Sequence, residues 1–276
     1  MEFHPPPIPT TIRGSVPNML AFFTTPVFVW RPVGVMETKI KCPNSNCPAP
    51  PGSYIIRSGF GTYARQVCGT KHFYTLLTER LMCSHCKKVR HAAAEKSGGT
   101  GGDEDDDDDD DDEVQFGNQQ QYLWLASSPK ILMNLAPAIH SMFPAILCGK
   151  RAIDKSVVTL LNDRLNSVSM SKVQRLVQQG HDEWYIERRD LYQTLLYEAH
   201  TVSQTLSQRG ILSYLKPSGT YTPPLPQTPI PCARVLRRAH MLMEMEKMPV
   251  YRASILSTTG QILCIDGTKQ VGNTHV

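Results

Sequence analysis

The chain lacks a long apolar run. The nearest candidate, MLAFFTTPVFVW at residues 19–30, has twelve residues and is interrupted by two threonines and a proline. A membrane-spanning helix needs about 20 apolar residues, so we expect none. The opening residues, MEFHPPPIPT, also lack the basic stretch and apolar core of a signal peptide. These absences predict an intracellular protein in a reducing environment, where clustered cysteines bind metal more often than they form disulfides.

Acidic residues are scarce outside one short segment. Residues 103–113 hold 11 of the 25 Asp and Glu residues, so the rest of the chain carries 29 basic residues against 14 acidic ones. The formal charge of +4 therefore hides a strongly basic remainder. Such a surplus suits a polyanionic partner, above all nucleic acid. It also aids solubility, so the charge alone does not decide the function.

Prolines, glycines and the acidic run divide the chain into pieces. We predict an α+β protein in which a small zinc-ribbon β module is followed by a helical domain and a truncated β-hairpin. The six segments, in chain order, are an irregular tail (1–34), the zinc-ribbon-like module (35–96), a disordered acidic linker (97–120), the helical domain (121–214), a proline-rich linker (215–231), and a helix followed by strands (232–276). The acidic linker is too highly charged to pack.

Four of the eight cysteines form two close pairs. Cys42 and Cys47 have the spacing C-x4-C, Cys83 and Cys86 have the spacing C-x2-C, and hairpin-like sequence separates the pairs. Two turns at strand ends that present four thiolates to one tetrahedral ion make a zinc ribbon. We therefore predict a structural Zn²⁺, whose binding energy helps a small module to fold. Four other side chains lie close enough in sequence to replace one of these ligands: Cys68, His72, His85 and His91.

The other three cysteines stand alone in the sequence. Cys148, Cys232 and Cys264 have no ligand-like neighbours at metal-binding spacing. An isolated cysteine in an intracellular protein usually behaves as a small apolar residue. We predict that all three are buried.

The region after the acidic linker has helical periodicity. Apolar residues spaced four apart predict a helix over 153–166, and Ser171 and Gln174 stand at capping-box spacing before a second helix that stops at Gly180. A longer helix is predicted over 182–206. The first two helices are compatible with a helix-turn-helix and also with an ordinary helical hairpin. Five basic residues of this region are candidates for phosphate contacts: Lys150, Arg151, Arg164, Lys172 and Arg175.

The last part of the chain begins as a helix and then changes pattern. Residues 232–248 predict one helix, whose methionines we expect in the core. The sequence VYRASILSTTGQILCIDGTKQV then predicts two strands around a Thr-Gly turn. Asp266 follows the second strand, where an Asp-Gly pair is typical of a hairpin turn.

Three motifs together resemble a known family. They are TERLMCSHCKKV, SMFPAILCGKRAIDKSVVTLLNDRLNSVS and GQILCIDGTKQV. In this order they resemble an uncharacterised zinc-binding domain family of transposon-derived vertebrate proteins. That family is similar to the N-terminal part of DDE transposases of the Mutator and KDZ kind. The resemblance covers roughly residues 35–276, apart from the acidic insertion.

The resemblance implies a role for Asp266. In such transposases an RNase H-like domain follows the zinc module and helices, and its first strand ends in the first metal-binding acid. Residues 232–276 then correspond to a helix and the start of a truncated RNase H-like domain. Two-metal phosphodiester cleavage needs further carboxylates, and no acidic residue follows Asp266. The resemblance thus implies that Asp266 is a vestigial catalytic acid and that this chain is not an enzyme.

These observations lead to one expected function and two alternatives. We expect a transposase-derived, zinc-binding nuclear protein that binds nucleic acid, with DNA as the expected form. The first alternative is the N-terminal part of an active DDE transposase. The second is a protein-interaction adaptor, because zinc ribbons and proline-rich stretches such as TPPLPQTPIP also bind proteins.

Overall fold

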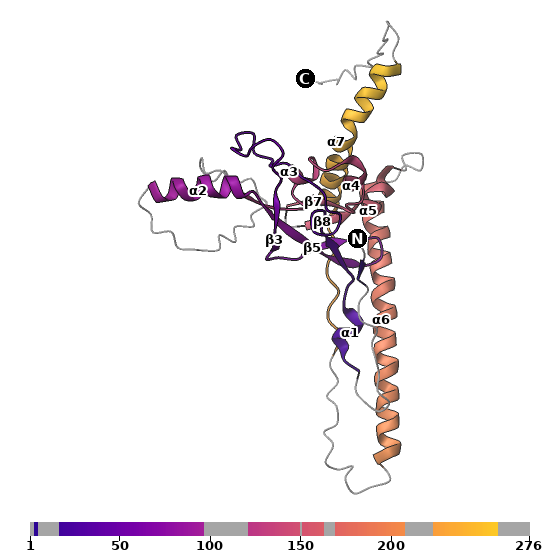
Figure 1. Ribbon diagram of the computed structural model, residues 1–276. Helices are drawn as coiled ribbons and strands as arrows, with labels where there is room; N and C mark the ends of the chain where they lie inside the picture. The colour runs from indigo at the N-terminus through magenta and orange to yellow at the C-terminus, as the bar shows by residue number, and fades with distance from the viewer. Residues whose placement is uncertain are drawn as a thin grey trace, which may run out of the picture.

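The chain folds into one mixed sheet from which long helices project (Figure 1). The computed structural model describes residues 3–4, 17–96, 121–149, 151–162, 169–207 and 223–258. The predicted α+β class is confirmed. Within these ranges, every helix is too short or too polar to cross a membrane.

Eight strands and seven α-helices are present in the described residues. The strands are β1 (Phe3–His4), β2 (Val27–Trp30), β3 (Ile56–Phe60), β4 (Arg65–Cys68), β5 (Phe73–Met82), β6 (Leu123–Leu125), β7 (Ala145–Cys148) and β8 (Arg151–Asp154). The helices are α1 (Met19–Phe23), α2 (Ser84–Lys96), α3 (Pro129–Leu132), α4 (Pro137–Ser141), α5 (Lys155–Thr159), α6 (Met170–Ser207) and α7 (Ala233–Thr258), with a 3-10 turn, η1 (Leu160–Asn162), after α5.

Strand β5 is the centre of the sheet. β2 runs parallel to it on one side and β4 antiparallel on the other, while β3 and β6 flank its last four residues. β8 pairs in parallel with β4, and β7 pairs with β8. Segments far apart in the sequence therefore share one sheet.

Two predicted segments differ from the structure. The expected irregular tail over 1–34 contributes α1 and β2, and the expected helical region over 121–214 contributes β6, β7 and β8. These strands have three or four residues and are largely buried. Such short runs cannot show the alternation of a half-exposed strand, and their partners lie far away in sequence.

The core consists of two main apolar clusters. The larger one surrounds Trp30, Leu81 and Trp124 at the β5–β6 end of the sheet. The indole N–H of Trp30 donates a 3.0 Å hydrogen bond to the carbonyl oxygen of Ala126, so this buried polar group is satisfied. The second cluster joins β8 and α5 to α6 and α7 through residues such as Ile153 and Leu236.

Helix α6 is continuous over 38 residues, which corrects the prediction of two helices separated at Gly180. It also begins earlier than predicted, because the Ser169 hydroxyl accepts a hydrogen bond from the Lys172 N–H at 3.2 Å. Ser171 is therefore not the cap. Figure 1 shows α6 extending well beyond the sheet with α1 beside it. Phe22 of α1 meets Tyr192 of α6 edge to face, with ring centroids 5.5 Å apart.

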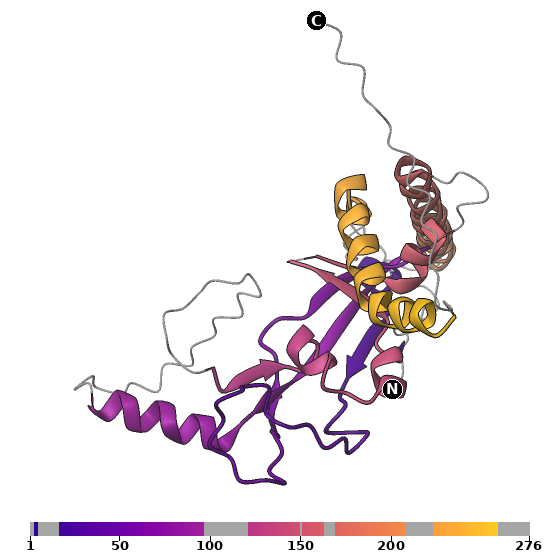
Figure 2. The ribbon, with the colours of Figure 1, turned by 90° about the horizontal axis from the view of Figure 1, so that it is seen from above.

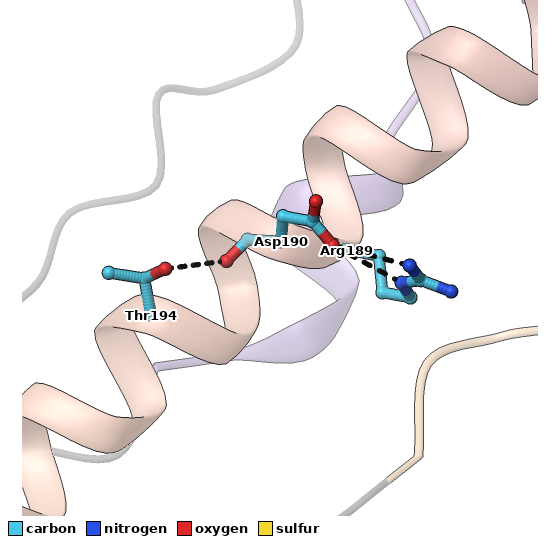
Figure 3. A network of polar contacts seen from close by, with 3 residues as sticks. All are labelled: Arg189, Asp190 and Thr194. Atoms are coloured by element: carbon cyan, nitrogen blue, oxygen red, sulfur yellow. Dashed lines mark hydrogen bonds and ion pairs between the residues drawn. The ribbon is translucent and has the colours of Figure 1, made fainter.

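The exposed side of α6 carries local polar contacts (Figure 3). The Thr194 hydroxyl donates to the carbonyl oxygen of Asp190 at 2.8 Å, and Arg189 forms an ion pair with Asp190 at 3.3 Å. Both charged side chains are largely exposed. An exposed ion pair contributes little stability, so α6 depends mainly on apolar contacts such as those with α1.

Helix α7 extends through Pro249 to Thr258, so the strand predicted to begin at Val250 is wrong. Figures 1 and 2 show that α7 begins near the sheet and that its C-terminal end projects away from it. Residues 250–257 are exposed, and without a neighbouring strand a helix satisfies its backbone groups locally. Of the α7 methionines, Met243 is buried, but Met241, Met245 and Met248 are exposed, which corrects their expected core position. The second predicted strand lies outside the described residues.

Candidate metal centre

The four predicted cysteine ligands converge in space. Their sulfur atoms all lie within 4.8 Å of one another. The Sγ–Sγ distances are 3.7 Å for Cys42–Cys86, 3.6 Å for Cys47–Cys83 and 3.5 Å for Cys47–Cys86. A disulfide would bring two sulfurs to about 2.05 Å. Four thiolates around Zn²⁺ at about 2.3 Å are about 3.8 Å apart, so the arrangement fits a tetrahedral metal.

Two different local structures present these ligands. Cys42 and Cys47 lie in the irregular segment between β2 and β3, where the Cys47 N–H donates to the Asn44 carbonyl oxygen at 3.3 Å. Cys83 directly follows β5 and Cys86 lies in the first turn of α2. The Lys87 N–H donates to the Cys83 carbonyl oxygen at 3.0 Å, which starts the helix at the second pair. The positive end of the helix dipole favours thiolates there.

Asn44 supports the cluster from outside it. Its side-chain N–H₂ lies 3.4 Å from the Cys86 sulfur and 2.6 Å from the carbonyl oxygen of Gln121. An amide that donates to a ligating sulfur stabilises its negative charge and fixes its position. Sequence reasoning missed Asn44, although its place inside CPNSNC, between the first two ligands, is a signal for such a role.

Burial and hydrogen bonds shift the pKa values of the cysteine thiols. Burial raises the pKa of Cys42. For Cys83, burial acts in the same direction, but hydrogen bonds from the Cys86 backbone and from Cys47 outweigh it and lower its pKa. Zinc ligation needs deprotonated thiols, so binding of the ion would release their protons. The four residues therefore fit Zn²⁺ in chemistry as well as in distance.

The alternative ligands do not join the cluster. Among the described residues, the four cysteines are the one group of His, Cys, Asp and Glu close enough to hold a metal. Cys68 instead lies 3.9 Å from the His181 Nε2 in a separate buried site. The His72 ring faces Trp184, the His91 ring faces Tyr122, and His85 lies on α2 outside the cluster.

The four-cysteine cluster adjoins the main core. Cys83 and Cys86 are buried in the same apolar cluster as Leu81 and Trp124. The cysteines therefore do not belong to a free-standing ribbon, and the second pair leads into a helix rather than a strand. A metal bound here would fasten the segment around Cys42 to the β5–α2 junction.

The isolated cysteines have different environments. Cys148 is buried, as predicted. Cys232 is exposed, which contradicts the prediction, because it directly precedes α7 and lies outside the core. Hydrogen bonds from the Val235 backbone lower the pKa of the Cys232 thiol. Cys264 lies outside the described residues.

Three of the five candidate phosphate-binding residues lie within the described residues. Arg151 begins β8, and Lys172 and Arg175 lie in the first two turns of α6; all three are exposed. Lys150, Arg164 and the candidate acid Asp266 lie outside the described residues. The first helix of the predicted helix-turn-helix is shorter than expected. Residues 151–154 form β8, and Asp154 caps α5 by accepting from the Ser156 N–H at 2.7 Å.

Comparison with known proteins identifies a family. A search of curated proteins and a search of solved structures found no match. A family profile described as "Domain of unknown function (DUF6729)" matches residues 1–96 and 118–242. The unmatched stretch between these ranges contains the acidic run. Because the profile covers most of the sequence, the chain belongs to the DUF6729 family.

Proposed function

We propose that this chain is a transposase-derived, zinc-binding protein that binds nucleic acid and is not itself an enzyme. The observation that carries the proposal is a four-cysteine centre set in a strongly basic part of the chain. The cysteine geometry supports the metal, and the charge supports the partner.

The charge around the centre is one-sided. Residues 17–96 contain 11 Lys and Arg residues against three acidic ones, Glu37, Glu79 and Glu95. Glu79 is fully buried and contributes no free carboxylate to the surface. Arg151, Lys172 and Arg175 add exposed positive charge elsewhere on the fold. Lysine and arginine that neutralise phosphates supply most of non-specific nucleic-acid affinity.

The proposed metal has a structural role. Four thiolates fill the coordination sphere of tetrahedral Zn²⁺ and leave no position for water or substrate. The ion would hold the Cys42–Cys47 segment against the start of α2 and would not activate a nucleophile. This chemistry supports a binding function for the zinc centre rather than a hydrolytic one.

The transposase origin rests on the order of the motifs. The zinc pairs, the segment over 141–169 and GQILCIDGTKQV follow one another in an order that resembles a zinc-binding family similar to DDE transposases. In this proposal Asp266 is a relic of the first metal-binding acid, and two-metal phosphodiester cleavage needs further carboxylates besides it. Nuclear localisation follows from the proposed DNA partner. The alternative, that the chain is the N-terminal part of an active transposase, requires further acids beyond Val276.

Binding of the full zinc-loaded chain to duplex DNA tests the proposal. Fluorescence anisotropy over a salt series should give an affinity that falls linearly on logarithmic axes as counterions are released. Undetectable binding at low salt would overturn the nucleic-acid function. Incubation with supercoiled DNA and Mg²⁺ or Mn²⁺ tests whether the chain is an enzyme. Nicking of the DNA that is lost in Asp266→Asn would show catalysis and would contradict the proposal that Asp266 is a relic.

A protein-binding function has one observation in its favour. The Tyr185 hydroxyl donates to the carbonyl oxygen of Leu225 at 2.9 Å, which anchors the proline-rich segment on α6. Leu225 itself is exposed. An anchored, exposed proline-rich segment is a suitable ligand for an aromatic-lined groove. Deletion of residues 223–230 should leave DNA affinity unchanged if this segment binds protein alone.

A further inference from the structure

Two arginines lie over one exposed aromatic ring at the edge of the sheet. Phe60 ends β3, and 37% of its surface is exposed. The guanidinium carbons of Arg31 and Arg57 each lie 5.5 Å from the centre of its ring. An aromatic residue at a sheet edge usually turns toward the core, but Phe60 is absent from the buried clusters.

A β-bulge creates this arrangement. Arg57 pairs with Leu81 of β5, but Phe60 pairs with Glu79, so β3 contains one extra residue between the two pairs. Leu81 and Glu79 are two residues apart and share one face of the sheet. Arg57 and Phe60 therefore share that face as well, although without the bulge they would point to opposite sides. Gly59 permits the bulge, because its φ of +92° suits glycine.

The surface around Phe60 is available for a ligand. β3 pairs with β5 alone among the described strands, so its other edge is free of strand partners there. Arg57 is exposed and, within the described part of the chain, forms no ion pair with a carboxylate; Arg31 is half-buried, with its Nε atom fully buried. Tyr63, just after β3, is 66% exposed.

The same region carries a second pairing of this kind. The Lys39 ammonium lies 5.8 Å from the centre of the Tyr54 ring, and Tyr54 is exposed just before β3. Basic and aromatic side chains thus lie close together before β3 and within it, and a further aromatic residue follows the strand. Arginine beside an aromatic face is the combination that proteins use to hold unpaired bases, with stacking on the ring and phosphates on the guanidinium groups.

We propose that Phe60, with Arg31 and Arg57, forms a stacking site for an unpaired base of a single-stranded nucleic acid. This inference rests on the proposed nucleic-acid function and specifies the strand state that β3 recognises. In a duplex the base faces are covered by neighbouring bases, and a ring at a sheet edge has nothing to stack on. The 11 basic residues against three acidic ones in residues 17–96 favour a polyanion over a protein partner.

The test compares strand states with matched variants of the full zinc-loaded chain. The probes are fluorescein-labelled oligothymidylate and oligouridylate of about 20 nucleotides, long enough for one binding site, and a mixed-sequence duplex of the same length. The variants are Phe60→Ala, Phe60→Trp and Arg57→Gln. Tyr197→Ala is the control, because Tyr197 is an aromatic residue on α6 that is 74% exposed.

Phe60→Ala should weaken single-strand binding by about 5- to 150-fold, the range for one lost base stack. It should change duplex binding by less than about threefold, whereas Phe60→Trp should keep single-strand affinity because the larger ring still stacks. Arg57→Gln should reduce the salt dependence on the single strand. Comparison of the affinities for oligothymidylate and oligouridylate shows whether the site prefers single-stranded DNA or RNA.

The outcomes separate this inference from the proposed function. If Phe60→Ala binds single strands as tightly as the unmodified chain, or loses single-strand and duplex binding equally, the stacking site is overturned while the nucleic-acid function stands. If the unmodified chain binds neither probe at low salt, the proposed function itself fails. Equal thermal stability of Phe60→Ala and Tyr197→Ala would exclude unfolding as the cause of a loss.

Discussion

Gly180, in the middle of α6, lies against Thr70 in the turn between β4 and β5. A Cβ atom at Gly180 would stand 2.6 Å from the Thr70 carbonyl oxygen, well inside a normal contact. Glycine in a helix interior costs about 1 kcal/mol relative to alanine, and here it permits α6 to approach the sheet. The glycine that suggested a helix end in the sequence is a packing residue.

Gly180→Ala is therefore expected to destabilise the protein. The clash with backbone atoms should cost about 1 to 3 kcal/mol, as overpacking does, and so reverse the usual gain from helix propensity. Thermal and urea unfolding measure the change. Gln193→Ala, at an exposed position of the same helix, is the control and should leave stability within about 0.5 kcal/mol. An increase in stability for Gly180→Ala would show that α6 does not pack closely on this turn.

The cysteine cluster predicts a zinc-dependent fold. Cys42→Ser should remove the bound Zn²⁺ and lower the unfolding free energy by about 2 kcal/mol or more, because metal binding and folding are coupled. The corresponding fall in Tm is about 4 to 8 °C for a chain of this size. Metal analysis and calorimetry measure both. Cys232→Ser is the matched control, since Cys232 is exposed and outside the cluster. Full zinc content in Cys42→Ser would contradict the assignment.

The metal ligands were predictable because their signal is local. Two short cysteine spacings identify Cys42, Cys47, Cys83 and Cys86 without any knowledge of the fold. Asn44 and Glu79 were not identified, because their partners are distant in sequence. Asn44 reaches the carbonyl oxygen of Gln121, and that contact exists only when the sheet has formed.

The sheet itself was predictable only in part. The region around β5 was recognised as strand-rich, because it is long and rich in β-branched and aromatic residues. The sequence IDKSVVTLLNDRLN predicts a helix over 153–166, since Ile153 and Val157 are four residues apart. In the structure Ile153 lies in β8 and pairs with Cys68 of β4, and Val157 lies in α5. Both side chains are fully buried. The four-residue spacing therefore predicted correctly that these residues are buried, but it predicted the wrong backbone conformation for Ile153.

Glu79 is expected to stabilise the turn after β2. Its carboxylate is fully buried and accepts hydrogen bonds from the Val33 N–H at 2.7 Å and from the Gly34 N–H at 3.1 Å. Glu79→Gln places an N–H₂ group where an acceptor is needed and should cost about 1.5 to 3 kcal/mol. Glu37→Gln, at an exposed position, should have little effect. Equal stability of the two variants in urea would mean that the Glu79 hydrogen bonds do not matter for the fold.

The buried histidine His181 predicts how stability varies with pH. Only 3% of its surface is exposed, its Nε2–H donates to the Gly69 carbonyl oxygen at 2.9 Å, and its ring meets Phe73 edge to face. Burial lowers the pKa of His181 below the ordinary value of 6.5, and burial likewise lowers the pKa of His72. Below pH 6.5 the unfolded chain thus binds protons that the folded chain does not. Stability should fall as the pH drops through this value, and the loss should continue until the folded-state pKa is reached.

His181→Gln isolates the contribution of this residue. A glutamine amide can still donate to the Gly69 carbonyl oxygen but does not titrate, so the variant should lose less stability between about pH 7.5 and 5.5. One histidine contributes at most about 1.4 kcal/mol per pH unit, which urea unfolding at several pH values resolves. Acid release of zinc affects both proteins equally, because His181 lies outside the cysteine cluster. Parallel stability curves for the two proteins would show that His181 does not titrate on unfolding, and the pH dependence would then belong to His72 and the metal centre.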